Sequence, residues 1–187
     1  MKRIADLIFS SCLIIVLLPI MIITGVLIKL DSLGPIFYKQ KLNGAPVLRI
    51  GKNAKLFRYF KFRSMYIGTD EVTRIGFFIR RWHIDEVSEL FLVFIGKMSL
   101  VGPRPVEKSY VIRNNKAYYN SLSSKPGITG PWQINRKSGK TIEDVIKFNR
   151  WYSKHQCFLI DFSIIIKTPI AIIKNKECGV AETLKIL

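Results

Sequence analysis

Histidine, cysteine and acidic residues are scarce in this chain. Its 187 residues include two histidines and three cysteines, and no two cysteines form a CxxC pair. So few potential ligands argue against a zinc site, and an odd number of cysteines argues against a disulfide scaffold. A reducing, cytoplasmic setting is expected. Repeats, low-complexity tracts and linkers are also lacking, which predicts a single domain at residues 31–187 behind a membrane anchor at residues 1–30.

The shortage of acids leaves a strongly basic protein. Thirty Lys and Arg stand against thirteen Asp and Glu, a formal net charge of +17. Such an excess favours anionic partners: nucleic acid, an anionic lipid surface or phosphorylated substrates. Hydrophobic residues make up 49% of the chain, so the composition supports a folded core and argues against disorder.

One long uncharged run occupies the amino-terminal region, from Leu7 to Ile28. As a helix it would reach about 33 Å, the thickness of a bilayer core. Pro19 lies near its middle, where proline removes a backbone hydrogen bond and bends the helix. Basic residues flank both ends, and both ends can stay in the cytoplasm if the helix breaks at Pro19 and re-enters. An ordinary kinked transmembrane helix explains these residues equally well.

A basic stretch with interleaved aromatic residues follows the apolar run. Between Lys29 and Arg63 there are nine Lys or Arg residues and one acid, Asp31. Next to a membrane segment, this pattern favours contact with anionic headgroups of inner-membrane lipids. Stacking on single-stranded nucleic acid is the alternative. We expect lipid and no nucleic acid.

The rest of the chain shows short strands and longer helices. Two strands are predicted on either side of a hairpin turn at Asn43-Gly44. The segment Phe158–Ile173 is apolar but interrupted, which fits either an interfacial helix or a core helix. The predicted strands are Ile36–Tyr38, Val47–Ile50 and Leu56–Phe62, and the other predicted helices are Asp85–Ile95 (ended by Gly96), Lys108–Leu122 and Thr141–Gln156.

Two adjacent carboxylates, Asp85 and Glu86, follow the basic pair Arg80-Arg81. One carboxylate can attack or take a proton while the other holds a divalent cation, and arginines neutralise phosphate oxygens. The pattern therefore indicates chemistry on a phosphorylated substrate. An amphipathic helix with solvated acids is the alternative, because apolar residues at helical spacing follow the pair.

Two proline-rich loops add candidate ligands. Arg104 stands between two prolines, which stiffen its backbone and suit a guanidinium that must be held in place, although a plain rigid turn explains the prolines too. The loop Lys125–Trp132 is dense in Pro and Gly and precedes Gln133 and Arg136. Such loops can bring backbone N–H groups to a phosphate, although most are simply turns.

Taken in order, these motifs resemble the bacterial sugar transferase family of small monotopic polyprenyl-phosphate phosphoglycosyltransferases. The resemblance covers nearly the whole chain, and the joint order of the motifs is far more specific than any one of them. The matching residues are Lys2-Arg3 with Asp6, Pro19 in the apolar run, Gly34–Tyr38 with Gln40, Lys61–Met65, Arg74–Gly76 with Arg80, Asp85-Glu86, Met98–Pro105, Pro126–Gly130 with Gln133, and Asp161 with Lys167-Thr168.

The resemblance implies an α+β fold on the cytoplasmic face of the bacterial inner membrane. A re-entrant membrane helix would precede a small, mainly helical catalytic domain with a short β-hairpin or sheet and interfacial amphipathic helices. The implied enzyme transfers a sugar 1-phosphate from a UDP-sugar to polyprenyl (undecaprenyl) phosphate and releases UMP. This reaction is the first membrane step in the synthesis of a bacterial surface glycan, which is a capsule, an O-antigen, an exopolysaccharide or a glycoprotein.

The family pattern also implies roles for single residues. Asp85 would be the nucleophile and form a covalent phosphosugar intermediate. Glu86 would help to hold Mg²⁺, with Asp85 as a further ligand. A carboxylate can attack a diphosphate without first losing a proton, and Mg²⁺ and arginine would offset the charge that builds up. The candidates for binding substrate or phosphate are Arg104, Lys61, Arg63, Arg80, Gln133 and Arg136.

The sequence departs from the family pattern near this pair. Ser88 and Glu89 stand where Pro and Gln are common. One helical turn from Asp85, Glu89 could add a metal ligand or raise the pKa of a neighbouring acid. The departures keep two alternatives open: a catalytically impaired relative that assists a partner transferase, and a basic membrane-anchored adaptor that binds anionic lipid. The long apolar helices leave room for a homodimer.

Overall fold

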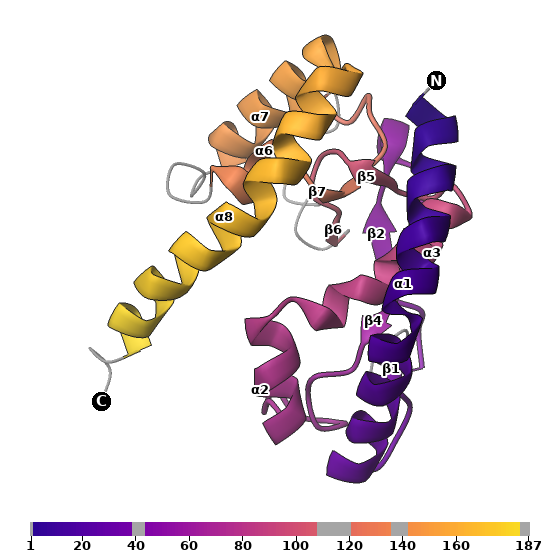
Figure 1. Ribbon diagram of the computed structural model, residues 1–187, viewed down its shortest axis with the longest axis vertical. Coiled ribbons are helices and arrows are strands. Elements are labelled where there is room, and N and C mark those ends of the chain that lie inside the picture. Colours follow the sequence, from indigo (N-terminus) through magenta and orange to yellow (C-terminus); the bar gives the residue numbers. More distant parts are fainter. Residues whose placement is uncertain (1, 39–43, 108–120, 136–141, 184–187) are drawn as a thin grey trace. The chain divides into compact units, whose positions relative to one another are not determined.

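The computed structural model describes residues 2–38, 44–107, 121–135 and 142–183 (Figure 1). The chain divides into two compact units. The first unit comprises Arg3–Arg49 and Leu56–Met98, and the second comprises Lys2, Ile50–Lys55 and Ser99–Leu187. Most of the predicted helix Lys108–Leu122 lies outside the described residues, as does Arg136.

The predicted apolar helix is present as α1 (Lys2–Asp31), but the expected break at Pro19 does not appear, because the helix continues through that residue. Among the described residues it is the one helix long and apolar enough to cross a membrane. Protein covers α1 at its two ends but buries no residue from Ser11 to Ile20. The buried residues are Asp6, Ser10, Met21, Thr24, Gly25 and Ile28.

Short strands pack beside α1 in the first unit. Strand β1 (Phe37–Tyr38) pairs antiparallel with β4 (Lys61–Phe62), in a register that places Phe37 opposite Phe62. The predicted hairpin between the first two strands is therefore wrong, because β2 (Leu48–Ile50) neighbours β3 (Leu56–Arg58) instead of β1. The rings of Phe37 and Phe62 stack at 5.1 Å, and both join the core formed with Met21 and Ile28 of α1. This burial outweighs the local turn signal.

Helix α2 (Arg74–Arg81) is tightly seated against α1 and β4. The hydroxyl of Thr73 caps its start by accepting from the Gly76 N–H at 2.8 Å. A side chain at Gly76 would collide with the backbone of Ser64. Ile75 and Ile79 pack in the core formed with α1, and the opposite face of α2 is exposed.

The predicted helix at Asp85–Ile95 is confirmed with one difference: it begins as a 3-10 helix (Ile84–Glu89) and continues as α3 (Leu90–Phe94). Gly96 ends it with φ +79°, a conformation that favours glycine. Arg3 at the start of α1 donates to the carbonyl oxygens of Val93 and Phe94, both at 2.6 Å. These bonds tie the start of α1 to carbonyl oxygens at the end of α3.

In the second unit, two parallel strands pack with three helices. Strand β5 (Ser99–Val101) pairs with β7 (Gly127–Thr129). Helix α6 (Pro131–Ile134) contacts both α7 (Ile142–His155) and α8 (Phe158–Thr183), as Figure 1 shows. The unit also holds β6 (Val106–Glu107) and a 3-10 turn at Lys52–Ala54. The predicted helix Thr141–Gln156 is confirmed as α7.

Helix α8 covers the predicted segment Phe158–Ile173 and extends beyond it. Up to Ile173, Ile164 is its one buried residue, so α8 is not a core helix in the part of the chain with described side chains. The large exposed hydrophobic residues on α8 are Phe158, Leu159, Phe162, Ile165, Ile166, Ile170 and Ile173.

Candidate active site

Asp85 is a buried carboxylate with a lysine partner. Only 3% of its surface is exposed, and its Oδ2 accepts a hydrogen bond from Lys61 Nζ at 2.9 Å. Strand β4 supplies Lys61, and the turn at His83, with φ +54°, leads into the segment that carries Asp85. A buried carboxylate needs a polar or charged partner, and Lys61 supplies one to Asp85.

Glu86, the second carboxylate, is partly exposed. Its Oε2 lies 3.5 Å from His83 Nδ1, and 29% of its side chain remains accessible. Adjacent residues thus place one carboxylate in the protein and one at its surface. No cluster of three His, Cys, Asp or Glu ligands occurs among the described residues. Because Mg²⁺ typically uses one or two carboxylates and completes its shell with water and phosphate oxygens, this donor pair fits Mg²⁺.

Glu89 is buried on the same segment, with 4% of its surface exposed. It accepts a hydrogen bond from the hydroxyl of Tyr59, a residue that sequence reasoning did not single out for the site. Burial, with a smaller effect of the Glu86 charge, raises the pKa of Glu89 to about 8. Burial and the Glu89 charge likewise raise the pKa of Tyr59. Glu89 therefore carries a proton at neutral pH.

Two predicted phosphate ligands of the first unit have protein partners. Arg63 is buried and donates to the Ser32 hydroxyl at 2.8 Å, the Ser32 carbonyl at 2.9 Å and the Pro35 carbonyl at 2.7 Å. These bonds fasten the turn that follows α1, so the guanidinium has a structural role here. Arg80 is half-buried, and its Nε donates to the Ser64 hydroxyl at 2.7 Å.

Two further predicted ligands lie in the second unit. Arg104 is half-buried in the loop after β5. Gln133 on α6 donates through Nε2 to the Ile128 carbonyl at 3.0 Å, while its Oε1 is buried without a hydrogen-bond partner among the described residues. The backbones of Gly102 and Gly127 approach so closely that neither has room for a side chain.

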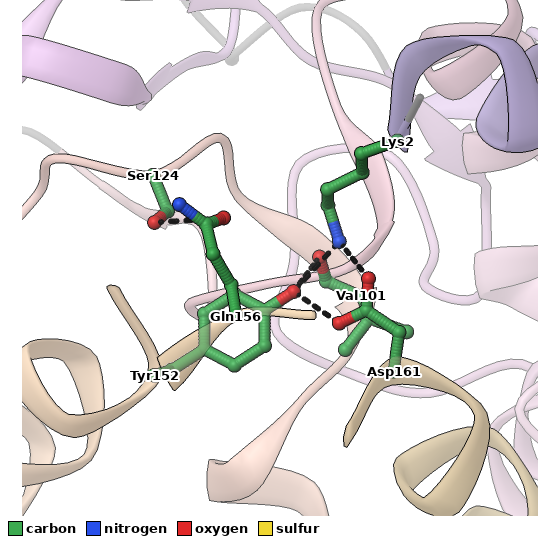
Figure 2. A network of polar contacts seen from close by, with 6 residues as sticks. All are labelled: Lys2, Val101, Ser124, Tyr152, Gln156 and Asp161. Carbon is green, nitrogen blue, oxygen red and sulfur yellow. Dashed lines mark hydrogen bonds and ion pairs between the residues drawn. The ribbon is translucent and has the colours of Figure 1, made fainter. Parts of the chain in front are cut away.

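A polar network holds the second unit together, as Figure 2 shows. Tyr152 is fully buried. Its hydroxyl accepts from Lys2 Nζ at 2.7 Å and lies 2.6 Å from Asp161 Oδ1 and 3.0 Å from the Val101 carbonyl. Lys2 also forms an ion pair with Asp161. The network fixes β5, the strand that leads to the Arg104 loop.

Within the first unit, the structure brings Lys61, Asp85, Glu86 and Glu89 together around one short segment. The arrangement offers an oxygen nucleophile, a nearby cation and a carboxylate open to solvent. In chemical terms it suits attack on a phosphorus atom followed by release of an anionic group.

The fold is α+β, with one long apolar helix beside a buried carboxylate site. The chain belongs to the bacterial sugar transferase family, whose pattern it matches over residues 1–175.

Three curated relatives name undecaprenyl phosphate and three different sugars. The chain is 30% identical to the undecaprenyl-phosphate galactose phosphotransferase of Salmonella typhimurium over 94% of this chain and 41% of the relative. It is 31% identical to the UDP-glucose:undecaprenyl-phosphate glucose-1-phosphate transferase of Klebsiella pneumoniae, with the same coverage of both chains. Identity is 32% with the UDP-N-acetylgalactosamine-undecaprenyl-phosphate N-acetylgalactosaminephosphotransferase of Aeromonas hydrophila, over 89% of this chain and 42% of the relative. The chain thus spans about two fifths of the length of these relatives.

Proposed function

We propose that this protein transfers a sugar 1-phosphate from a UDP-sugar to undecaprenyl phosphate. The observation that carries the proposal is the buried Asp85, paired with Lys61 and followed by the accessible Glu86, in the same compact unit as α1. The names of the relatives supply the substrate class. The phosphate of a membrane lipid stays at the membrane surface, so the reacting carboxylates must be held there. A membrane anchor in the same chain meets this requirement.

The reaction proceeds in two displacements at one phosphorus atom. An oxygen of Asp85 forms a bond to the phosphorus that bears the sugar, the phosphoanhydride bond breaks, and UMP leaves with the electron pair. A phosphate oxygen of the lipid then attacks the same phosphorus, and the bond to Asp85 breaks. This restores the carboxylate and gives undecaprenyl diphosphate sugar. Neither step requires a proton to be removed first.

Lys61 holds Asp85 in place and offers a positive charge to the incoming diphosphate. Arg80 is the proposed further substrate ligand in the first unit, and the family resemblance proposes Arg104 and Gln133 as ligands in the second unit. Glu86, with Asp85, would hold Mg²⁺, which when bound would offset the charge on the diphosphate.

The protein is proposed to lie on the cytoplasmic face of the inner membrane, with residues 1–30 as a re-entrant anchor and residues 31–187 as the catalytic domain. The uncovered middle of α1 around Pro19 supports lipid contact, and the exposed apolar residues of α8 support an interfacial position. In this setting it would begin the synthesis of a surface glycan, as a monomer or a homodimer.

The test is UMP release by the detergent-solubilised protein with Mg²⁺, undecaprenyl phosphate and UDP-galactose, UDP-glucose or UDP-N-acetylgalactosamine. We expect release with one donor and its loss by about 10³-fold or more in Asp85→Asn, because an amide is a poor nucleophile. Glu143→Gln, an exposed acid on α7, is the matched control. Full activity of Asp85→Asn would exclude Asp85 as the nucleophile.

The impaired-relative alternative has its own test. Ser88 Oγ is buried without a hydrogen-bond partner among the described residues, so replacing Ser88 removes no side-chain hydrogen bond in that part of the chain. Activity that appears only in Ser88→Pro with Glu89→Gln would favour the impaired relative over an active enzyme.

A further inference from the structure

The segment that carries Asp85 is anchored by two side chains from one extended stretch. Lys61 Nζ donates to Asp85 at 2.9 Å, and the hydroxyl of Tyr59 donates to Glu89. Tyr59 and Lys61 are two residues apart, the spacing at which side chains of an extended chain point to the same side. The 3-10 helix Ile84–Glu89 is thus held near its start by Lys61 and at its end by Tyr59.

Ile84 and Val87 of this segment pack against the core that contains Phe62 and Ile79, but several of its polar groups lack side-chain hydrogen bonds. Its N-cap residue, His83, makes no side-chain capping hydrogen bond, and neither does Glu89 at the start of α3. Ser88 Oγ has no hydrogen-bond partner within the described part of the chain. A 3-10 helix has poorer backbone hydrogen-bond geometry than an α-helix. Side-chain hydrogen bonds therefore contribute more to fixing the orientation of this segment.

Tyr59 is suited to be such an anchor because it is itself held firmly. It is 6% exposed, and its N–H donates to the Val47 carbonyl at 2.9 Å. The guanidinium carbon of Arg49 lies 4.9 Å from the centre of its ring, a cation–π contact. With backbone and ring both fixed, the hydroxyl is presented to Glu89 in one position, away from water.

We propose that Tyr59 is a positioning residue for Asp85, acting through its hydrogen bond to Glu89. Only the kinetic consequence of this role rests on the proposed transferase function. The site needs an acceptor that faces Tyr59, and an oxygen of either a carboxyl or an amide group meets that need. Glu89 is therefore assigned to Tyr59 rather than to a metal ion, and Glu in place of the family's usual Gln keeps the contact.

The first test measures hydrogen exchange at the backbone of Ile84–Leu90 in the full chain in nanodiscs. Tyr59→Phe is expected to speed exchange there by about fivefold, the effect of losing one net hydrogen bond. Glu89→Gln should stay near wild type, because the amide oxygen accepts the same bond. Tyr66→Phe, the same change at an exposed tyrosine, is the matched control. Unchanged exchange in Tyr59→Phe would overturn the proposal.

The second test separates positioning from mere stability. In UMP release, Tyr59→Phe is expected to lower kcat by about tenfold or more with little change in the KM for the UDP-sugar. The double variant Tyr59→Phe with Glu89→Leu removes both polar partners, so its Tm should recover towards wild type while kcat stays low. Recovery of kcat together with Tm would reduce Tyr59 to a structural role. If the wild-type protein releases no UMP, the proposed function fails, and the exchange measurement alone decides the role of Tyr59.

Discussion

At the scale of single residues, three acids on one short segment have three different environments. Asp85 is buried beside a lysine, Glu86 reaches solvent next to His83, and Glu89 is buried against a tyrosine. One local sequence thus yields a carboxylate paired with Lys61, an accessible carboxylate and an acid with a raised pKa, because each side chain meets a different partner. The proposed chemistry uses Asp85 and Glu86.

The protonated state of Glu89 predicts a pH-dependent stability difference. Between the ordinary pKa of 4.5 and the raised value of about 8, the folded protein binds a proton that the unfolded chain has lost. The contribution of Glu89 to the free energy of unfolding is therefore fully present below this interval. It falls as the pH rises through the interval, by at most about 1.4 kcal/mol per pH unit.

Glu89→Gln removes this titration and keeps the acceptor for Tyr59. We expect the Tm of Glu89→Gln relative to wild type to rise with pH across the interval from 4.5 to about 8, as measured by thermal unfolding in detergent. A Tm difference that does not change with pH would show that Glu89 is already ionised in the folded protein.

At the scale of elements, helix α2 has one buried apolar face and one exposed face of aromatic and basic residues. Ile75 and Ile79 pack in the core with α1. The outer face carries exposed aromatic and basic side chains at helical spacing, a composition that suits the headgroup layer of a membrane. Its residues are Arg74, Phe77, Phe78, Arg81 and the adjoining Trp82. The 3-10 helix with Asp85 follows within a few residues, so docking of α2 would hold the carboxylate close to the lipid phosphate.

Fluorescence quenching tests the placement of α2. In vesicles that contain phosphatidylglycerol, a variant that keeps Trp82 alone (Trp132→Phe with Trp151→Phe) should be quenched by lipids spin-labelled near the headgroup and protected from aqueous iodide. The matched control keeps Trp151 alone, since Trp82 is 54% exposed and Trp151 is 47% exposed. Strong iodide quenching of Trp82 without lipid quenching would place α2 in water.

At the scale of the whole molecule, the question is whether α1 crosses the membrane or returns. The helix is continuous through Pro19, and basic residues flank both of its ends. Moving Lys or Arg across the membrane is disfavoured, so we expect both ends on the cytoplasmic side.

Cysteine labelling in intact cells tests this topology. The native cysteines Cys12, Cys157 and Cys178 are replaced by Ser, and single cysteines are placed at the exposed positions Ile4 or Leu30. A re-entrant α1 predicts that an impermeant maleimide labels neither Ile4→Cys nor Leu30→Cys from outside, and labels both after lysis. External labelling of one of the two would establish a spanning helix.

The sequence by itself determined the features that depend on local patterns. Uncharged length predicted α1, the apolar run of Phe158–Ile173 predicted α8, and the order of the motifs identified the family. The Asp85-Glu86 pair was found because adjacent residues stay adjacent in any fold. Gly96 ended its helix as predicted because a positive φ favours glycine locally.

Only the tertiary structure decided which distant residues meet. The pairing of β1 with β4 follows from the burial of Phe37 and Phe62 against α1, which no turn signal reveals. Arg63 looked like a phosphate ligand, yet its guanidinium fastens the turn after α1. The partners Lys61 for Asp85 and Tyr59 for Glu89 lie 24 and 30 residues away along the chain. The spacing of residues along the sequence does not predict such contacts, because they depend on which surfaces are buried together when the chain folds.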